Sequence, residues 1–136
     1  AKGVPIQEAL VRVRDALSKV DICVGHNVSF DKRFMIVEGI RNSIRMNFPA
    51  DYCTMKNSKE VCKIEYTFSN GDKGFKYPKL MELYEHLFPG IPAPQNLHNS
   101  FADTIITLKC YCKLAHGVNM SLESREFRAL FRENCC

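Results

Sequence analysis

The sequence has no hydrophobic run that approaches 18 residues, and its first residues do not form a signal peptide. A chain without such a run has no segment that could cross a membrane as a helix. Without a signal peptide, a chain is expected to remain inside the cell. It also contains no internal repeat and no low-complexity tract. We therefore expect an intracellular protein, cytoplasmic or nuclear, that has no membrane partner.

No C-x-x-C pair occurs among the seven cysteines, which are irregularly spaced. Zinc sites and redox motifs usually contain such pairs, so neither is expected. An odd number of scattered cysteines favours free thiols in a reducing compartment. The adjacent Cys135 and Cys136 end the sequence and are expected to be exposed.

The composition is that of an ordinary globular domain. Of the 136 residues, 46% are hydrophobic and 25% are charged, which permits a packed core and at most one domain. The formal net charge of +4 is a mild basic bias. Such a bias permits a polyanionic partner but does not require one.

Apolar spacing predicts helices separated by two short strands. The helices are expected at 5–19, from Asn27 or Ser29 to about 43, and at 56–62, 78–88, 99–116 and 122–134; the strands at 21–24 and 50–54. Residues 65–77, which contain Asn70-Gly71, are predicted to form a turn or mobile loop. This order is that of an α/β protein. Two strands are too few for a buried sheet, so the chain supplies about half of one.

Asp31 follows a predicted strand and a Gly-His-Asn turn, and it falls in the first turn of the next predicted helix. In open α/β sheets this position faces the ligand crevice at the carboxyl ends of the strands. Acidic residues are also favoured in a first turn because they complement the helix dipole. Asp31 alone therefore fits either a metal ligand or a helix-stabilising carboxylate.

His98 and Asp103 are five residues apart at the start of the long helix predicted after the proline-rich segment 89–95. If His98 precedes the helix, it can reach over a pocket that Asp103 enters. That arrangement suits a mobile general base beside a fixed metal ligand. The other interpretation is a capping histidine and a first-turn aspartate on a solvated helix.

Together, two segments resemble the second and third motifs of the DEDDh 3′–5′ exonucleases, a proofreading family with an RNase H-like fold. They are GHNVSFDKRF at 25–34 and LHNSFADTIITL at 97–108. Three further segments are similar to parts of the same domain: GVPIQEALVRVRDAL at 3–17, DYCTMK at 51–56 and YPKLMELYEHLF at 77–88. The motifs stand in the order of the family, and the resemblance extends to about residue 116.

The resemblance implies a partial RNase H-like fold, with a mixed sheet flanked by helices. Residues 1–117 would form the C-terminal part of an exonuclease domain, and residues 118–136 a C-terminal helix and tail. The intact domain would hydrolyse phosphodiesters from the 3′ end of single-stranded DNA or RNA. A polymerase is a possible partner, as it is for proofreading members of the family.

Roles for individual residues follow from the same resemblance. Asp31 and Asp103 would hold two Mg²⁺ or Mn²⁺ ions, which prefer oxygen ligands, and His98 would deprotonate the attacking water. His26 and Asn27 would position the substrate. Phe30 is assigned to substrate binding as well, although the apolar side of its helix, with Phe34, is expected in the core.

The first motif of the family, D-x-E on the central strand, does not occur in this sequence. That motif would supply two of four acidic groups, and two carboxylates are a poor cage for two divalent ions. We therefore expect a missing N-terminal half that carries D-x-E, and we expect this chain alone to be inactive. The alternative is a non-catalytic module of the same fold that binds nucleic acid or protein.

Aromatic and basic residues alternate around the predicted loop at 65–77. They are Tyr66, Phe68, Lys73, Phe75, Lys76, Tyr77 and Lys79. Interleaved rings and cations can hold single-stranded nucleic acid. A solvated loop with ordinary packing aromatics is the other interpretation.

Overall fold

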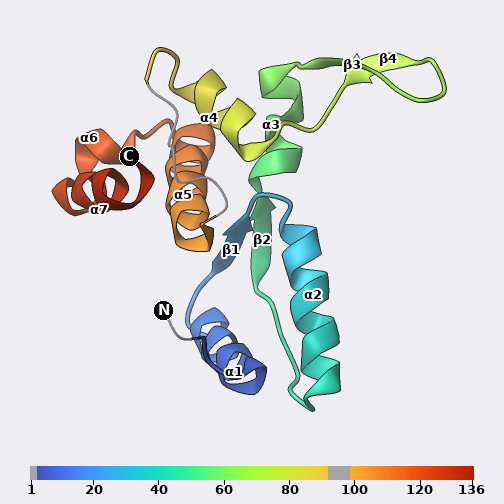
Figure 1. Ribbon diagram of the computed structural model, residues 1–136, viewed down its shortest axis with the longest axis vertical. Helices are drawn as coiled ribbons and strands as arrows, with labels where there is room; N and C mark the ends of the chain where they lie inside the picture. The colour runs from blue at the N-terminus through green and yellow to red at the C-terminus, as the bar shows by residue number, and fades with distance from the viewer. Residues whose placement is uncertain (1–2, 92–98) are drawn as a thin grey trace. The chain divides into compact units, whose positions relative to one another are not determined.

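The computed structural model describes residues 3–91 and 99–136. The chain forms two compact units, Ala1–Cys53 (the first unit) and Thr54–Cys136 (the second unit). The structure is mixed α/β and mostly helical, with two small two-stranded sheets (Figure 1). The predicted α/β class is therefore confirmed at this level. Among the described residues, no helix is both long enough and apolar enough to cross a membrane.

The first unit is built on two parallel strands. It runs through α1 (Ile6–Leu17), β1 (Ile22–Gly25), α2 (Val28–Arg41) and β2 (Ala50–Cys53). Ile22 pairs with Ala50 and Gly25 with Cys53, so both strands run in one direction. Parallel neighbours need a crossover connection, usually a helix. Here α2 is that connection, and it packs against both strands and against α1 (Figure 1).

Most of the apolar side of α2 is exposed, so the prediction that Phe30 and Phe34 belong to the core is wrong. Phe30 is 62% exposed, Phe34 54% and Ile40 74%. In α2 the buried residues are Val28 and Gly39. A helix buries its apolar stripe only where a facing element covers it. The β1–β2 pair is narrow, and within the described residues no third strand widens it.

Gly39 lies where the chain after α2 folds back onto the helix. A Cβ atom on Gly39 would come within 2.5 Å of the carbonyl oxygen of Ile44 and 3.0 Å of the Met46 Cγ. The Ile44 amide also donates a hydrogen bond to the Gly39 carbonyl at 2.8 Å. The glycine is therefore required by this close backbone approach.

The second unit packs α3 (Thr54–Cys62), α4 (Leu80–Leu87), α5 (Ser100–His116), α6 (Met120–Glu123) and α7 (Arg125–Cys135) around one core (Figure 1). The buried core residues are Leu83, Tyr84, Phe88, Ala102, Ile105, Ile106, Cys110, Phe127, Phe131 and Cys135. They come from α4, α5 and α7 and from the residue after α4. Gly117 ends α5 in the left-handed conformation, at φ 68°, as predicted for a C-cap. The division predicted at residue 117 stays a prediction.

A lysine lies within this core. Lys109 is only 3% exposed, and its ammonium lies 4.3 Å from the ring centre of Phe131, 4.4 Å from that of Phe88 and 5.3 Å from that of Tyr84. Burial lowers the pKa of Lys109 because the charged form is poorly solvated there. Three aromatic faces offset part of that cost through cation–π attraction.

Residues 65–77, predicted as a loop, form a hairpin of β3 (Glu65–Thr67) and β4 (Lys73–Phe75). The predicted turn at Asn70-Gly71 is present, and Gly71 has φ 89°. The Phe68 amide bonds the Asp72 carbonyl at 2.8 Å, and the Asn70 side chain bonds the Asp72 amide at 3.0 Å. Each strand has three residues, which is too short for a clear alternating pattern in the sequence.

All seven cysteines are free thiols, which is consistent with a reducing compartment. The expectation that Cys135 is exposed is wrong, because it is fully buried against α5, whereas Cys136 is exposed as predicted. The Cys135 thiol lies 3.7 Å from the carbonyl oxygen of Ala102. The last turn of α7 therefore belongs to the core.

We expect Gly39→Ala to destabilise the protein by about 1–3 kcal/mol, as overpacking typically does. The direction of this change in stability is informative, because in an unobstructed helix interior alanine is more favourable than glycine by about 1 kcal/mol. Urea unfolding followed by circular dichroism measures the change. Gly3→Ala is the control and should have no effect, since nothing lies within 4 Å of its Cβ position. A more stable Gly39→Ala protein would contradict the close approach to Ile44.

Candidate functional site

Two helices of this chain begin in the same way. In α2 the N-cap is Asn27 and the fourth helical residue is Asp31; in α5 the N-cap is Asn99 and the fourth helical residue is Asp103. Each aspartate therefore lies in the first turn of its helix, one turn beyond an asparagine. The carboxylates share this position relative to the helix start, although the helices belong to different units.

The two helix starts differ in their backbone. Asn27 is left-handed, at φ 67° and ψ 49°, and its side chain makes no capping hydrogen bond. The Asn99 side chain accepts hydrogen bonds from the amides of Phe101 at 3.0 Å and Ala102 at 3.3 Å. The start of α2 thus turns sharply after β1 without a side-chain cap. Asparagine tolerates that conformation better than most residues do.

Gly25 makes the sharp turn between β1 and α2 possible. A Cβ atom at Gly25 would lie 3.1 Å from the Cβ of Val28, which is buried. A larger residue would push Val28 away from the end of the strand. The half-buried His26 and the exposed Asn27 complete this turn at the carboxyl end of β1.

Asp31 has no hydrogen bond or ion pair with any described residue. The adjacent Lys32 instead pairs with Asp51 of β2, at 2.6 Å. Burial of its carboxyl raises the pKa of Asp31 above its ordinary value, although the residue as a whole is exposed. A carboxylate that accepted backbone amides would have a lowered pKa. The N-cap of α2 is Asn27, and the Asp31 carboxylate oxygens accept no hydrogen bond from the described residues.

Asp103 is half-buried, and its carboxylate likewise has no hydrogen bond or ion pair with the described residues. Its backbone is held by helical bonds: its amide donates to the Asn99 carbonyl at 2.9 Å, and its carbonyl accepts from the Thr107 hydroxyl at 2.7 Å. The pKa of the nearby Cys135 thiol is raised by burial and, to a lesser extent, by the charge of Asp103. The helix thus fixes the backbone of Asp103, and its carboxylate oxygens have no partner within 3–91 and 99–136.

The other predicted site residues are less fully defined. His98 lies outside the described residues. Phe30 projects from the first turn of α2 with more than half of its surface exposed. Asp31, with His26, Asn27 and Phe30, lies in the first unit, and Asp103 lies in the second.

The described residues fit only part of a divalent cation site. Unpaired carboxylate oxygens at Asp31 and Asp103 are the donors that Mg²⁺ and Mn²⁺ prefer. However, 3–91 and 99–136 contain no group of three or more histidine, cysteine, aspartate or glutamate side chains that could hold a metal ion. These segments alone therefore do not build a complete metal centre.

Four of the seven cysteines are poorly suited to metal binding or nucleophilic chemistry. Burial raises the pKa of Cys23, Cys62 and Cys112 above the ordinary value, and it raises the pKa of Cys110 to about 12. The thiolate is the metal ligand and the nucleophile, and these thiols stay protonated near neutral pH. Chemistry at oxygen ligands is therefore favoured over chemistry at sulfur.

One signal in the sequence was missed. His26 to Asp31 and His98 to Asp103 have the same pattern, H-N-x-x-x-D. In both α2 and α5 the asparagine is the N-cap residue and the aspartate is the fourth helical residue. Aligning the two segments with each other would have found this correspondence.

Comparison of the chain with protein-family models, with curated proteins and with solved structures finds no match.

We expect Asp31→Asn to raise the melting temperature slightly at pH 7. A raised pKa means that the folded state disfavours the ionised carboxyl, so the carboxyl's contribution to stability is lost as pH rises through that pKa. Asparagine has no charge at any pH. The difference in melting temperature between the two proteins should therefore disappear at lower pH, where Asp31 is protonated. The effect is small because water screens an exposed charge.

Thermal unfolding of both proteins between acidic and neutral pH measures the difference. Asp21→Asn is the matched control, because Asp21 is exposed and lies just before β1, away from the helix start. A lower melting temperature for Asp31→Asn at pH 7 would show that the carboxylate stabilises the helix start instead.

Proposed function

We propose that this chain carries the second and third motifs of a metal-dependent 3′–5′ exonuclease of the DEDDh type, with an RNase H-like fold. The substrate would be the single-stranded 3′ end of DNA or RNA. The observation that carries the proposal is the matched position of Asp31 and Asp103, each in a first helical turn with unpaired carboxylate oxygens. An unpaired carboxylate at a helix start is available to a cation.

The fold around Asp31 supports the same proposal. β1 and β2 are parallel, and the Gly25–Asn27 turn leads from the carboxyl end of β1 into α2. Ligands of open α/β sheets bind at the carboxyl ends of the strands. Asp31 therefore lies at the end of the sheet where a catalytic site is expected.

A further segment that carries D-x-E would complete the proposed enzyme. A two-stranded parallel sheet is exceptional, because parallel strands are normally buried with neighbours and with helices on both faces. The apolar side of α2, which includes Phe34 and Ile40, is exposed in the same unit. Additional strands would cover this surface and bring two more carboxylates.

The roles proposed for this chain's own residues are limited and specific. Asp31 and Asp103 would each supply oxygen ligands, and the ions, when bound, would polarise the scissile phosphate and lower the pKa of the attacking water. His98 would accept the proton of that water. His26, Asn27 and Phe30 would position the terminal nucleotide at the helix start.

A non-catalytic binding module of the same fold is the second candidate. It is favoured by the absence of D-x-E and by the lack of a three-ligand metal cluster in the described part of the chain. Such a module would need neither a free carboxylate at Asp31 nor one at Asp103.

The two candidates are separated by expressing the chain together with its upstream in-frame coding sequence. The assay follows the Mg²⁺-dependent, stepwise shortening of a 5′-labelled single strand as mononucleotides are removed from its 3′ end. Release that ceases in EDTA supports the exonuclease. An extended protein that contains a D-x-E strand and still releases nothing would overturn it.

In the active protein, we expect His98→Ala to lower kcat by about 10²–10⁴-fold while the Kd for a 3′ end stays unchanged, because a general base acts in the chemical step. Turnover is measured with Mg²⁺ and binding with Ca²⁺. The matched control is His86→Ala, which removes an exposed histidine from α4. Full turnover of His98→Ala would exclude His98 as the base.

We expect Asp103→Asn to lower the rate and to shift the Mg²⁺ concentration needed for half-maximal activity upward, because an amide is a weaker ligand than a carboxylate. Asp21→Asn should leave both quantities as they are. A reduced rate with an unchanged Mg²⁺ titration would place Asp103 outside the coordination sphere.

A further inference from the structure

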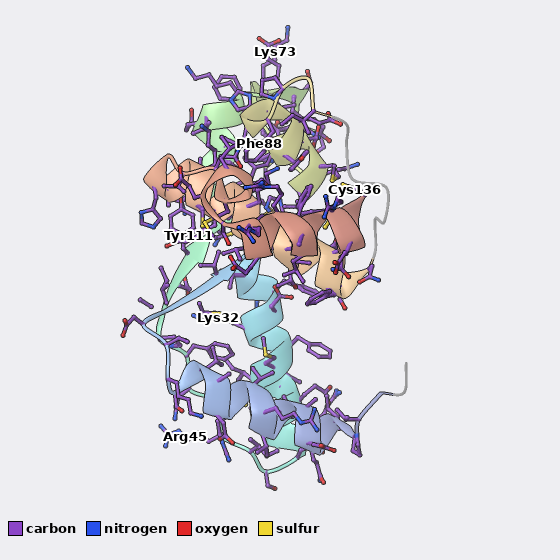
Figure 2. All side chains as sticks on the ribbon, turned by 90° about the vertical axis from the view of Figure 1, so that its left-hand side faces the viewer. Lys32, Arg45, Lys73, Phe88, Tyr111 and Cys136 are labelled. Atoms are coloured by element: carbon purple, nitrogen blue, oxygen red, sulfur yellow. The ribbon has the colours of Figure 1, made fainter. Side chains whose placement is uncertain are left out.

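The β3–β4 hairpin of the second unit carries large aromatic side chains into solvent. Every residue of β3 is exposed, and Tyr66 is 50% exposed. The Tyr66 and Phe68 rings contact each other edge to face, with centroids 5.3 Å apart. Within the second unit the hairpin extends away from the helices (Figure 1), and Lys73 pairs with Thr67 next to the turn. Figure 2 shows Lys73 at the top of the view, apart from Phe88.

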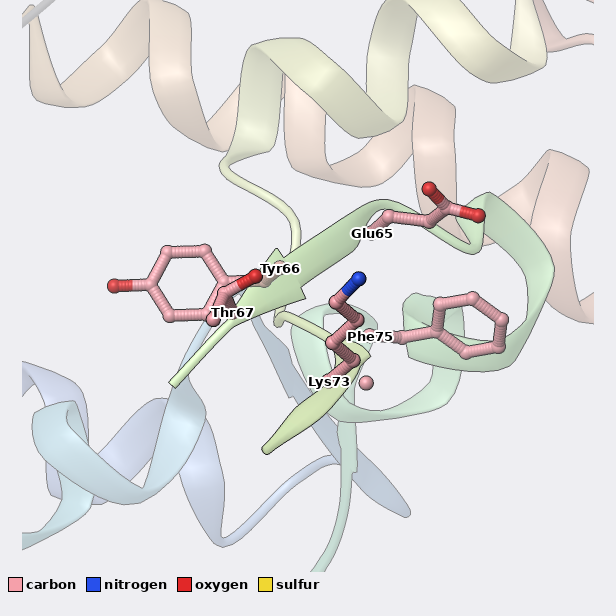
Figure 3. Close-up of a pocket in the computed structure, with 6 residues that line it drawn as sticks. Glu65, Tyr66, Thr67, Lys73 and Phe75 are labelled. Carbon is pink, nitrogen blue, oxygen red and sulfur yellow. The ribbon is translucent and has the colours of Figure 1, made fainter. Parts of the chain in front are cut away.

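A depression of about 610 Å³ lies on this hairpin. It is lined by Glu65, Tyr66, Thr67, Lys73, Gly74 and Phe75 (Figure 3). Its volume is within the range of small-ligand sites. Gly74 leaves the middle of the ribbon without a side chain, and the Phe68 ring lies close to it, 3.0 Å from where a Cβ atom would be.

The register of the hairpin brings a ring, a cation and a hydroxyl to one face. Glu65 pairs with Phe75 and Thr67 with Lys73. Directly paired residues of antiparallel strands point to the same face, and so do residues two apart. Lys73 therefore lies beside Phe75 and opposite Thr67, as Figure 3 shows.

The charge of this region is positive. Residues 56–79 contain six lysines and three acidic residues, an excess of three positive charges, whereas the whole chain has an excess of four. Lys76 is paired with Glu82 at 2.9 Å, and the Lys59 ammonium lies 5.2 Å from the Tyr77 ring centre. Lys73 has no ion pair with the described residues, so its charge is available to a partner.

The tip of the hairpin is ordered by its own hydrogen bonds. Asn70 and Asp72 bond each other through their side chains at 3.0 Å, in addition to the backbone bonds that close the turn. Gly71 supplies the positive φ that this turn requires. A two-stranded hairpin is marginal by itself, and these bonds hold the ribbon ready for a ligand.

We infer that the β3–β4 hairpin is a binding arm for single-stranded nucleic acid. Unpaired bases stack on the exposed Tyr66 and Phe68 rings on one face of the ribbon, and the Lys73 ammonium on the other face, next to the turn, contacts a phosphate where the strand passes the edge of this narrow ribbon. Exposed rings beside cations are the chemistry that holds single strands without sequence preference, because every base has a π face. Bases in a duplex are stacked on each other and cannot reach the rings. The inference deepens the proposed function and rests on it for the choice of nucleic acid as the occupant.

Fluorescence anisotropy tests this arm in the full chain with EDTA present, so that no cleavage occurs. The probe is a labelled oligo-deoxythymidine of about 12 nucleotides, within the usual site size. We expect Tyr66→Phe to bind like the unmodified chain and Tyr66→Leu to bind at least about fivefold more weakly, because leucine keeps the apolar bulk but lacks a stacking face. Phenylalanine is favoured in strands and leucine is not among the residues that strands disfavour, so we expect both variants to keep the hairpin.

Lys73→Ala should reduce the slope of log Kd against log salt concentration by about 0.7, the value for one phosphate contact on a single strand. Two controls lie on the surface of the same unit: Leu122→Ala, at a residue that is 74% exposed, and Arg132→Ala, which removes an equal charge from α7. We expect neither control to weaken binding as Tyr66→Leu does or to lower the salt slope as Lys73→Ala does.

The inference is overturned if the chain does not bind the oligonucleotide, or if Tyr66→Leu and Tyr66→Phe bind equally. It is also overturned if a duplex of the same length binds as tightly, or if an acidic peptide displaces the oligonucleotide and depends on Tyr66 in the same way. These results concern binding without metal, so they leave the exonuclease proposal standing. Conversely, a chain that binds through the hairpin but cleaves nothing when D-x-E is supplied overturns the proposed function alone.

Discussion

The parallel pairing of β1 with β2 is the constraint on which the first unit depends. Because the strands run in one direction, the chain must return through a crossover helix, and α2 is that helix. The same pairing sets the direction in which α2 starts, from the carboxyl end of β1. The ion pair between Lys32 and Asp51 then connects the first turns of α2 to β2. Asp31, next to Lys32, has no hydrogen bond or ion pair in the described part of the chain, and it follows the carboxyl end of β1, the end at which ligands of open α/β sheets bind.

Polar groups of this chain lie in two kinds of environment. In the second unit, the buried Lys109 ammonium is surrounded by three aromatic rings, and the buried Cys110 has a pKa raised to about 12. These groups belong to a closed core and are removed from chemistry. The exposed Asp31 and the half-buried Asp103 are instead at helix starts, and neither carboxylate has a hydrogen bond or ion pair with the described residues. Carboxylates in such positions, together with protonated thiols elsewhere, favour a role for hard cations over one for sulfur chemistry.

Both units also expose apolar surface that a packed domain would cover. In the first unit this is the side of α2 that contains Phe34 and Ile40, and in the second it is the hairpin with Tyr66 and Phe68. The two surfaces have different neighbouring groups. The α2 surface adjoins a two-stranded sheet and therefore suits further strands. The hairpin surface is mixed with lysines and suits a ligand that is both planar and anionic.

The sequence by itself determined the order of the elements, because helical spacing, the two short apolar strands and the Gly117 C-cap are local features. It also identified the candidate carboxylates, because Asp31 and Asp103 each fall in the first turn of a predicted helix. Tertiary structure alone decided that Phe34 is exposed and that Cys135 is buried, because burial depends on which element faces a side chain. It also decided that Gly39 is required and that residues 65–75 form a hairpin. The burial of Cys135 depends on α5, which is distant in the sequence, and Gly39 is required because the chain folds back at Ile44. The hairpin strands are too short to have a period. None of these features is encoded in apolar spacing.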